Sequence, residues 1–185
     1  MIDCDLGRSN ASQHISHRTS YMNLWIIRHA KSSWADPTQA DFDRPLNDRG
    51  KRDGKRMMKW MRKQPDRPRL LISSDAVRAR ATTEFVRSGY DIDAHNVTFD
   101  HRLYLAEPET ILEVVRALPD DCASVGLVGH NPGSTEFVNA MVGDGVVDDM
   151  PTFAIVLLEV TGRWADARFG GASFVELQTP KNLRD

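Results

Sequence analysis

Three short apolar runs stand out along the chain, and polar residues follow each of them. The runs cover residues 23–27, 69–73 and 124–129. Runs of this length, apolar on both faces, are typical of central strands in a parallel sheet. The pattern therefore predicts three buried strands.

Segments with helical periodicity lie between and after these runs. Residues 47–63 place Gly50, Gly54 and three methionines on one face. Residues 108–118 begin with proline, which suits the first position of a helix, and residues 133–142 follow an Asn-Pro start signal. Strands that alternate with helices predict an α/β fold, a three-layer sandwich whose central, mostly parallel sheet is flanked by helices.

The C-terminal part of the chain has a different pattern. Residues 153–160 are rich in strand-forming side chains, and a Thr-Gly pair separates them from residues 163–169, which alternate apolar and polar side chains. This pattern predicts a C-terminal β-hairpin with one solvent-exposed face. Such a hairpin suits either the edge of the sheet or a dimer contact, so the oligomeric state stays open.

Length and composition indicate one domain. The chain has 185 residues, of which 41% are hydrophobic and 27% are charged, as is usual for a globular protein. Residues 1–21 are polar and lack the apolar stretch of a secretory signal. We expect residues 1–21 to be a disordered N-terminal extension, with Met22 as an alternative first residue, and residues 22–185 to form a single domain.

Charge and cysteine content narrow the range of partners. The net charge of −2 favours neither nucleic acid nor a membrane surface, and no apolar run approaches the roughly 20 residues needed to span a bilayer. Cys4 and Cys122 are far apart in the sequence, which argues against a disulfide framework and a thiolate metal site. We therefore expect a cytoplasmic protein without nucleic-acid or membrane partners.

One segment has a strongly biased charge. Residues 44–69 contain eleven Lys or Arg and three Asp. A solvated helix face is the usual explanation of such a run, and docking of an acidic or phosphorylated partner is the alternative. Trp60 is the one aromatic residue in the segment, which gives little support to a nucleic-acid platform.

Reactive side chains follow all three apolar runs. Arg28 and His29 follow the first, residues 73–78 with Arg78 follow the second, and His130 follows the third. The carboxyl ends of parallel strands form the ligand crevice of α/β sheets, so we expect these residues to converge. Guanidinium groups match phosphate oxygens, and a histidine beside them serves as a nucleophile or as an acid or base. The combination predicts a phosphate site.

Other interpretations exist for each residue. His29 or His130 alone suits a buried, hydrogen-bonded core histidine, and Arg78 and Arg80 suit the surface of a helix. A metal site on the two histidines is opposed by the neighbouring arginines and by the lack of a nearby carboxylate–histidine spacing for a third ligand. The set therefore favours phosphate chemistry without a metal.

Four segments of the sequence resemble motifs of the histidine phosphatase superfamily, in the same order as in that family. The run Arg28 to Trp34 and the compact length are most similar to SixA-like phosphohistidine phosphatases. Ala30 stands where the family's first motif usually has glycine. The matching segments are residues 24–30 (the RHG-type motif), 44–50 (RPLTxxG), 73–82 (SSPLxRAxQT) and 128–131, which holds the second histidine.

This resemblance implies a metal-independent phosphatase that needs no cofactor. It implies that His29 attacks phosphorus and becomes a phosphohistidine, which water then hydrolyses. The resemblance also implies that Arg28, Arg78 and His130 bind the phosphate oxygens and complete the catalytic set.

One departure from the family bears on the substrate. Larger relatives carry a glutamate general acid in an Arg-Leu-Asn-Glu-like run, whereas residues 102–105 read Arg-Leu-Tyr-Leu. Glu107 lies two residues further on, and its role as the acid stays open. A phosphoramidate needs such an acid less than an ester does, so we expect phosphohistidine in a phosphorylated protein as the substrate. The alternatives are a small phosphate ester, or a non-catalytic module that binds phosphate or a phosphoprotein.

Overall fold

A computed structural model describes residues 21–183 of the chain. The expected disordered extension lies outside the described residues, apart from Tyr21, which begins the first strand. The strands are β1 (Tyr21–Arg28), β2 (Leu70–Ser73), β3 (Val97–Phe99), β4 (Ser124–Gly129), β5 (Ile155–Thr161) and β6 (Ala172–Gln178). The helices are α1 (Asp48–Met61), α2 (Val77–Tyr90), α3 (Pro108–Arg116) and α4 (Gly133–Val142). Short 3-10 turns are η1 (Asp41–Asp43), η2 (Ala94–Asn96), η3 (His101–Leu103), η4 (Trp164–Asp166) and η5 (Pro180–Asn182).

The six strands form one sheet in the order β3-β2-β4-β1-β5-β6. The first four are parallel, whereas β5 runs antiparallel to β1, and β6 runs antiparallel to β5. The predicted α/β class with a mostly parallel sheet is therefore confirmed.

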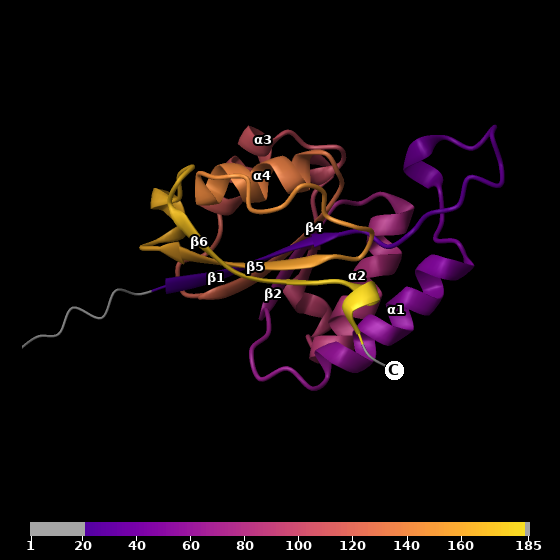
Figure 1. Cartoon of the computed structure of the whole chain (residues 1–185), viewed down its shortest axis with the longest axis horizontal. Helices are drawn as coiled ribbons and strands as arrows, with labels where there is room; N and C mark the ends of the chain where they lie inside the picture. Colours follow the sequence, from indigo (N-terminus) through magenta and orange to yellow (C-terminus); the bar gives the residue numbers. More distant parts are fainter. Residues whose placement is uncertain (1–20, 184–185) are drawn as a thin grey trace, which may run out of the picture.

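Helices cover both faces of the sheet, with α3 and α4 on one side and α1 and α2 on the other (Figure 1). Strand β1 alternates between the two layers: Leu24 and Ile26 belong to the core under α3 and α4, and Trp25 and Ile27 belong to the core under α1 and α2. Burial on both faces explains why this strand is a continuous apolar run. The predicted three-layer sandwich is confirmed.

The chain leaves β1 and β4 on opposite faces of the sheet. After β1 it enters α1 on one face, and after β4 it enters α4 on the other (Figure 1). The two strands are neighbours, with Arg28 paired to Gly129 at their ends. Such a divergence opens a crevice at the carboxyl ends of adjacent strands. His29 and His130 are the first residues beyond these ends.

The C-terminal hairpin is present, but the prediction for its second strand was wrong. Strand β5 pairs with β6, which begins at residue 172, nine residues after the predicted start at residue 163. Residues 163–169 instead form η4 and a loop. Trp164 is fully buried there, and its Nε1 donates to the carbonyl of Cys122 at 2.9 Å. Trp164 and Ala167 insert into the core under α3 and α4 at the three-residue spacing of a 3-10 turn, whereas Phe169 is exposed.

Most of the basic segment is a solvated helix face. Helix α1 buries Gly50, Gly54, Met57 and Met61. Its exposed cationic residues are Arg49, Lys51, Arg52, Lys55 and Lys59. Arg44 is an exception, because it is buried beside the predicted site. None of the described helices is both long and apolar enough to cross a membrane.

Candidate active site

The predicted histidines and Arg78 meet at the carboxyl ends of β1 and β4. Arg78, in the first turn of α2, places its Nε 3.2 Å from Nε2 of His29 and its Nη2 3.2 Å from Nδ1 of His130. The two imidazole ring centroids are 4.9 Å apart. Three segments distant in sequence therefore bring Arg78, His29 and His130 into one cluster of side chains, termed the His29 pocket, as the strand-end argument predicts.

Backbone contacts fix the position of His29. Its N–H donates to the carbonyl of Gly129 at 3.1 Å, and its carbonyl accepts from the N–H of Phe153 at 3.1 Å. The N–H of Ala30 donates to Oγ1 of Thr82 at 2.9 Å, which ties the loop to α2. His29 is therefore held from both sides of the strand and from the helix that carries Arg78.

The hydrogen bonds select one neutral tautomer for each imidazole. Nδ1 of His29 lies 2.7 Å from the carbonyl oxygen of Ala30, so it carries the hydrogen, and Nε2 accepts from Arg78. His130 has the opposite arrangement, because its Nδ1 accepts from Arg78 and its Nε2 donates to Oγ of Ser74 at 2.8 Å. The lone pair on Nε2 of His29 therefore faces the guanidinium.

Burial and nearby cations keep both imidazoles neutral. Burial is the main cause that lowers the pKa of His29 to about 4; Arg78, Arg28 and Arg44 lower it further, against an opposing effect of the hydrogen bond to the Ala30 carbonyl. The pKa of His130 is lowered to about 3 by burial first, then by His29, Arg78 and Arg28, with an opposing effect of Asp41. Unprotonated His29 is the form that can attack phosphorus.

Arg28 lies at the end of β1, on the side of the pocket near residues 149–150. Its Nη1 donates to the carbonyl of Met150 and lies 3.4 Å from Oδ2 of Asp149. Its Nε is buried and has no hydrogen-bond partner among residues 21–183. This N–H is therefore a donor that a bound oxyanion could satisfy.

Sequence reasoning missed Asp41, which lies in η1. Its Oδ2 accepts hydrogen bonds from Nη2 of Arg78 and from the hydroxyl of Tyr104, both at 2.8 Å, and its Oδ1 accepts from Nη1 of Arg44 at 2.6 Å. Its backbone carbonyl accepts from Nη1 of Arg78. The position of Asp41, three residues before Arg44 of the RPL motif, was the one sequence signal for it.

Arg44 was quoted in a motif but was not among the predicted site residues. Its Nε donates to the carbonyl of Ser33 at 2.8 Å and its Nη2 donates to Oγ of Ser32 at 2.6 Å. Its guanidinium carbon lies 3.2 Å from the ring centroid of Trp34. Arg44 therefore holds the loop that follows His29 against η1, and it orients Asp41 from the opposite side to Arg78.

Glu107 lies at the N-terminus of α3, with its residue exposed to solvent. None of the contacts described for residues 21–183 joins its carboxylate to Arg78, His29 or His130. The same part of the chain contains no group of three or more His, Cys, Asp or Glu that could hold a metal ion.

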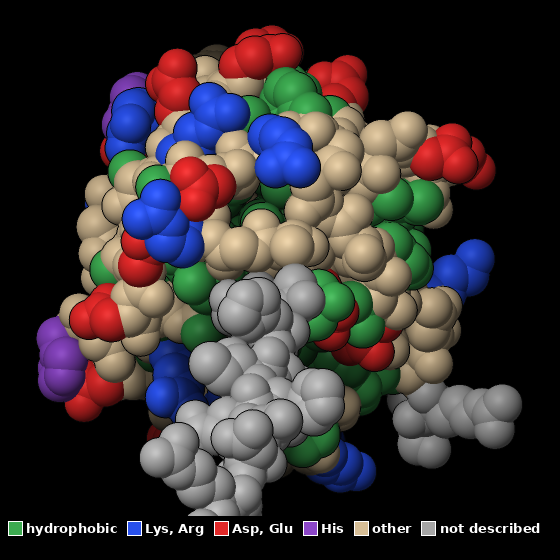
Figure 2. Space-filling model, turned by 90° about the vertical axis from the view of Figure 1, so that its left-hand side faces the viewer, with side chains coloured by type: hydrophobic (Ala, Val, Ile, Leu, Met, Phe, Trp, Pro, Cys, Tyr) green, Lys and Arg blue, Asp and Glu red, His purple; other side chains and the backbone are tan. Residues whose placement is uncertain are grey.

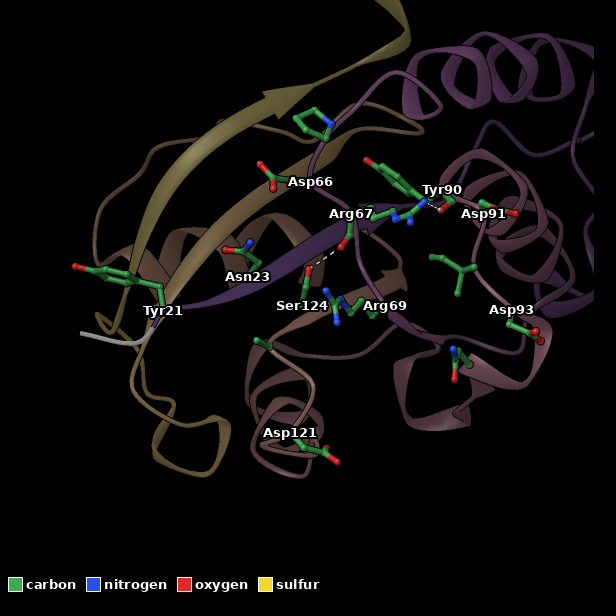
Figure 3. A pocket seen from close by; sticks show the side chains of 14 residues that line it. Tyr21, Asn23, Asp66, Arg67, Arg69, Tyr90, Asp91, Asp93, Asp121 and Ser124 are labelled. Atoms are coloured by element: carbon green, nitrogen blue, oxygen red, sulfur yellow. Dashed lines mark hydrogen bonds between the residues drawn. The ribbon is translucent and has the colours of Figure 1, made fainter. Parts of the chain in front are cut away.

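A separate cavity lies at the opposite end of the sheet. It measures about 770 Å³ and is lined by residues at the amino ends of the parallel strands, including Tyr21, Arg69 and Ser124 (Figure 3). Acidic and basic side chains are interspersed on this end of the molecule (Figure 2). None of the predicted site residues lines this cavity, so it is separate from the pocket at His29.

Comparisons with known proteins agree with the geometry. Residues 24–104 match the family model of the histidine phosphatase superfamily, branch 1. An uncharacterised protein of Mycobacterium tuberculosis is 33% identical over 164 residues, covering 84% of this chain and 100% of the relative. An uncharacterised protein of Mycobacterium leprae is 31% identical over 166 residues, covering 84% of this chain and 100% of the relative.

Solved structures share the fold. A protein from Agrobacterium tumefaciens, designated a phosphohistidine phosphatase SixA, is 28% identical with a TM-score of 0.74, over 86% of this chain and 98% of that one. A mycobacterial glucosyl-3-phosphoglycerate phosphatase is 14% identical with a TM-score of 0.62, over 83% and 97%, which is a likeness of fold alone. Together with the sequence relatives, these findings show that the chain belongs to the histidine phosphatase superfamily, branch 1, as a SixA-like phosphatase.

Proposed function

We propose that this phosphatase removes the phosphoryl group from phosphohistidine in a cytoplasmic protein, with His29 as the nucleophile. The observation that carries the proposal is the charge state of the pocket. It combines an unprotonated imidazole with fixed guanidinium groups and has no protonated carboxylic acid among its described contacts. Such a pocket suits a leaving group that brings its own proton.

The first step transfers the phosphoryl group to the enzyme. When the substrate binds, the Nε–H of Arg78 turns from Nε2 of His29 to a phosphate oxygen, which frees the lone pair on Nε2. This lone pair attacks phosphorus, and the bond between phosphorus and the substrate nitrogen breaks. The electron pair of that bond goes to the substrate imidazole, which leaves neutral when its other nitrogen is protonated. The N–H groups of Arg28 and Arg78 then bind the non-bridging oxygens, and His130 joins them when its Nε2–H turns from Oγ of Ser74 to an oxygen.

The second step releases phosphate. A water oxygen attacks phosphorus, the bond from phosphorus to Nε2 of His29 breaks, and its electron pair returns to the imidazole. Phosphate takes up the oxygen of water together with its two protons and leaves as H2PO4−. The hydrogen bond from Nδ1 of His29 to the carbonyl of Ala30 keeps the ring in one orientation through both steps.

A phosphate-release assay on a protein phosphorylated on histidine tests the proposal. We expect release by the wild type and a loss of at least about a thousandfold in His29→Ala, with retention of phosphate binding through the arginines. His95→Ala, which removes an exposed histidine, is the control. Turnover of small esters without release from phosphohistidine would contradict the proposal. A wild type and a His29→Ala variant that both bind phosphate and are equally inert would contradict it too.

A further inference from the structure

Asp41 places an acidic side chain in this cationic pocket, and neither step above uses it. Its carboxylate accepts three hydrogen bonds: from Arg78, from Arg44 and from the hydroxyl of Tyr104. A carboxylate that only had to pair with a buried arginine would need fewer partners. The arrangement holds both oxygens in fixed positions beside the phosphate-binding guanidinium.

Exposure places Asp41 at the mouth of the pocket. Its side chain is 41% exposed, whereas the Arg78 side chain that it contacts is 3% exposed. His29 attacks phosphorus from within the pocket, and in-line displacement puts the leaving group on the opposite side of phosphorus. A leaving group attached to another protein must therefore lie toward the mouth, where Asp41 lies.

Asp41 is an acceptor at neutral pH. The hydrogen bonds and charges of its partners outweigh the opposing effect of burial, and they lower the pKa of Asp41 to about 2. An ionised carboxylate has no proton to give to an alkoxide, but it accepts a hydrogen bond from a protonated ring nitrogen.

We propose that Asp41 determines specificity for phosphoramidates: its carboxylate accepts a hydrogen bond from the protonated nitrogen of the departing substrate imidazole. This inference rests on the proposed function. When the bond between phosphorus and nitrogen breaks, its electron pair goes to the ring, which leaves as neutral imidazole. The hydrogen stays on the other ring nitrogen, which donates it in a hydrogen bond to Asp41, and no proton is transferred. The same negative charge repels small esters that carry carboxylates of their own.

Several charged or titratable groups surround Asp41, and all must be considered in its pH dependence. Arg78 comes from α2 and His130 from the loop after β4. Arg44 lies directly after η1, and Tyr104 lies directly after η3. The two arginines and the hydroxyl of Tyr104 donate hydrogen bonds to Asp41, and His130 is neutral. The charge that a substrate imidazole meets at Asp41 is therefore constant above about pH 4, where His29 and His130 begin to titrate.

The test compares two substrates with the variants Asp41→Asn, Asp41→Glu and, as control, Asp43→Asn. Asp43 is an exposed carboxylate in the same turn. Phosphoimidazole needs a protonated leaving ring, whereas p-nitrophenyl phosphate releases a stable anion. For phosphoimidazole we expect Asp41→Asn to lower kcat/KM about tenfold and to shift the basic limb of the pH profile down by about one unit. The nitrophenyl ester should lose less activity, through the effect of Asp41 on Arg78 that both substrates share, so the ratio of the two kcat/KM values should fall at least about threefold.

Each outcome decides the inference. Asp41→Glu should restore part of the phosphoimidazole activity, and Asp43→Asn should match the wild type on both substrates. An equal loss on both substrates in Asp41→Asn, or no loss on either, would overturn the specificity role. If Asp41→Asn does not fold, Asp41→Ser replaces it, with thermal melting as the check. A wild type that hydrolyses the ester but not phosphoimidazole would instead contradict the proposed function itself.

Discussion

Arg78 connects the parts of the pocket through one guanidinium group. Its Nε faces His29, and its Nη2 is shared between Asp41 and His130. A lysine at this position would keep the charge but not the planar fork. We expect Arg78→Lys to lower kcat/KM by roughly a hundredfold to a thousandfold in a steady-state assay.

Arg80→Lys is the matched control for this substitution. Arg80 lies two residues further along α2, at the surface, with its Nε on the carbonyl of Asp75 and its guanidinium over Phe99. Activity within about twofold of the wild type is expected for it. A large loss of activity in Arg80→Lys, or no loss in Arg78→Lys, would contradict the role assigned to the planar guanidinium of Arg78.

His29 should titrate far below an ordinary histidine. Its pKa is lowered from 6.5 to about 4, with burial as the largest cause and Arg78, Arg28 and Arg44 as further causes. In an NMR titration of the ring C–H resonance we expect a midpoint near pH 4. Replacing a nearby cation, as in Arg28→Met, should raise that midpoint, because a repulsion of the imidazolium is removed. A midpoint near 6.5 in the wild type would contradict the neutral form of His29 that the proposed mechanism requires.

The residues predicted from sequence lie at the ends of apolar strands or within a few residues after them. His29, Arg78 and His130 could be placed together because strand ends share an edge of the sheet. Asp41 and Tyr104 could not, because each lies in an irregular segment between motifs. Their contacts with the pocket depend on tertiary packing, which hydrophobic periodicity does not predict.

At the scale of elements, the close approach of α4 to the segment before α3 depends on Gly133. A Cβ added there would overlap the carbonyl oxygen of Ala106. Helix α4 begins three residues after His130, so we expect Gly133→Ala to lower the free energy of unfolding by about 1–3 kcal/mol and to reduce activity as well. Urea denaturation and phosphate release measure the two effects.

Gly145→Ala provides the comparison for Gly133→Ala. Gly145 is exposed, and a Cβ there would meet nothing within 4 Å. The free energy of unfolding of Gly145→Ala should therefore stay within about 0.5 kcal/mol of the wild-type value. Equal effects of the two substitutions would show that the overlap with Ala106 does not limit the packing of α4.

Helices and strands were predicted correctly where the buried side chains recur at the regular spacing of a helix, or where a strand is buried on both faces. The apolar runs of β1 and β4 and the periodicity of α1 and α3 were sufficient for that reason. The prediction failed at residues 163–169, where Trp164 and Ala167 enter the core from a 3-10 turn and a loop. Period-two alternation does not distinguish such a turn from a strand.

At the scale of the whole molecule, the charged groups of the site lower the stability of the folded state. The sheet brings two imidazoles and three guanidiniums to one crevice, and desolvation there opposes any further positive charge. A phosphate dianion would offset this charge. Binding of phosphate to the folded state should therefore stabilise the protein, and the empty pocket should be the part most sensitive to acid.

The sign of the pH effect follows from the lowered pKa values of the two histidines. In the unfolded chain both titrate near 6.5, whereas in the folded chain His29 titrates at about 4 and His130 at about 3. Between these limits the unfolded state binds more protons, so the free energy of unfolding falls as the pH drops below about 6.5. Asp41 contributes only in a lower window, because its pKa moves from 3.8 to about 2.

Urea denaturation should therefore show that the free energy of unfolding falls from pH 7.5 to pH 5. The expected loss is roughly 2 kcal/mol for each of His29 and His130. Replacing the imidazoles with neutral amides, in His29→Asn and His130→Asn, should reduce this loss, because an asparagine takes up no proton in either state. Equal pH sensitivity of the wild type and the double variant would place the acid-sensitive groups elsewhere. A reduced loss in the double variant would identify the desolvation that keeps His29 and His130 neutral as the source of the instability in acid.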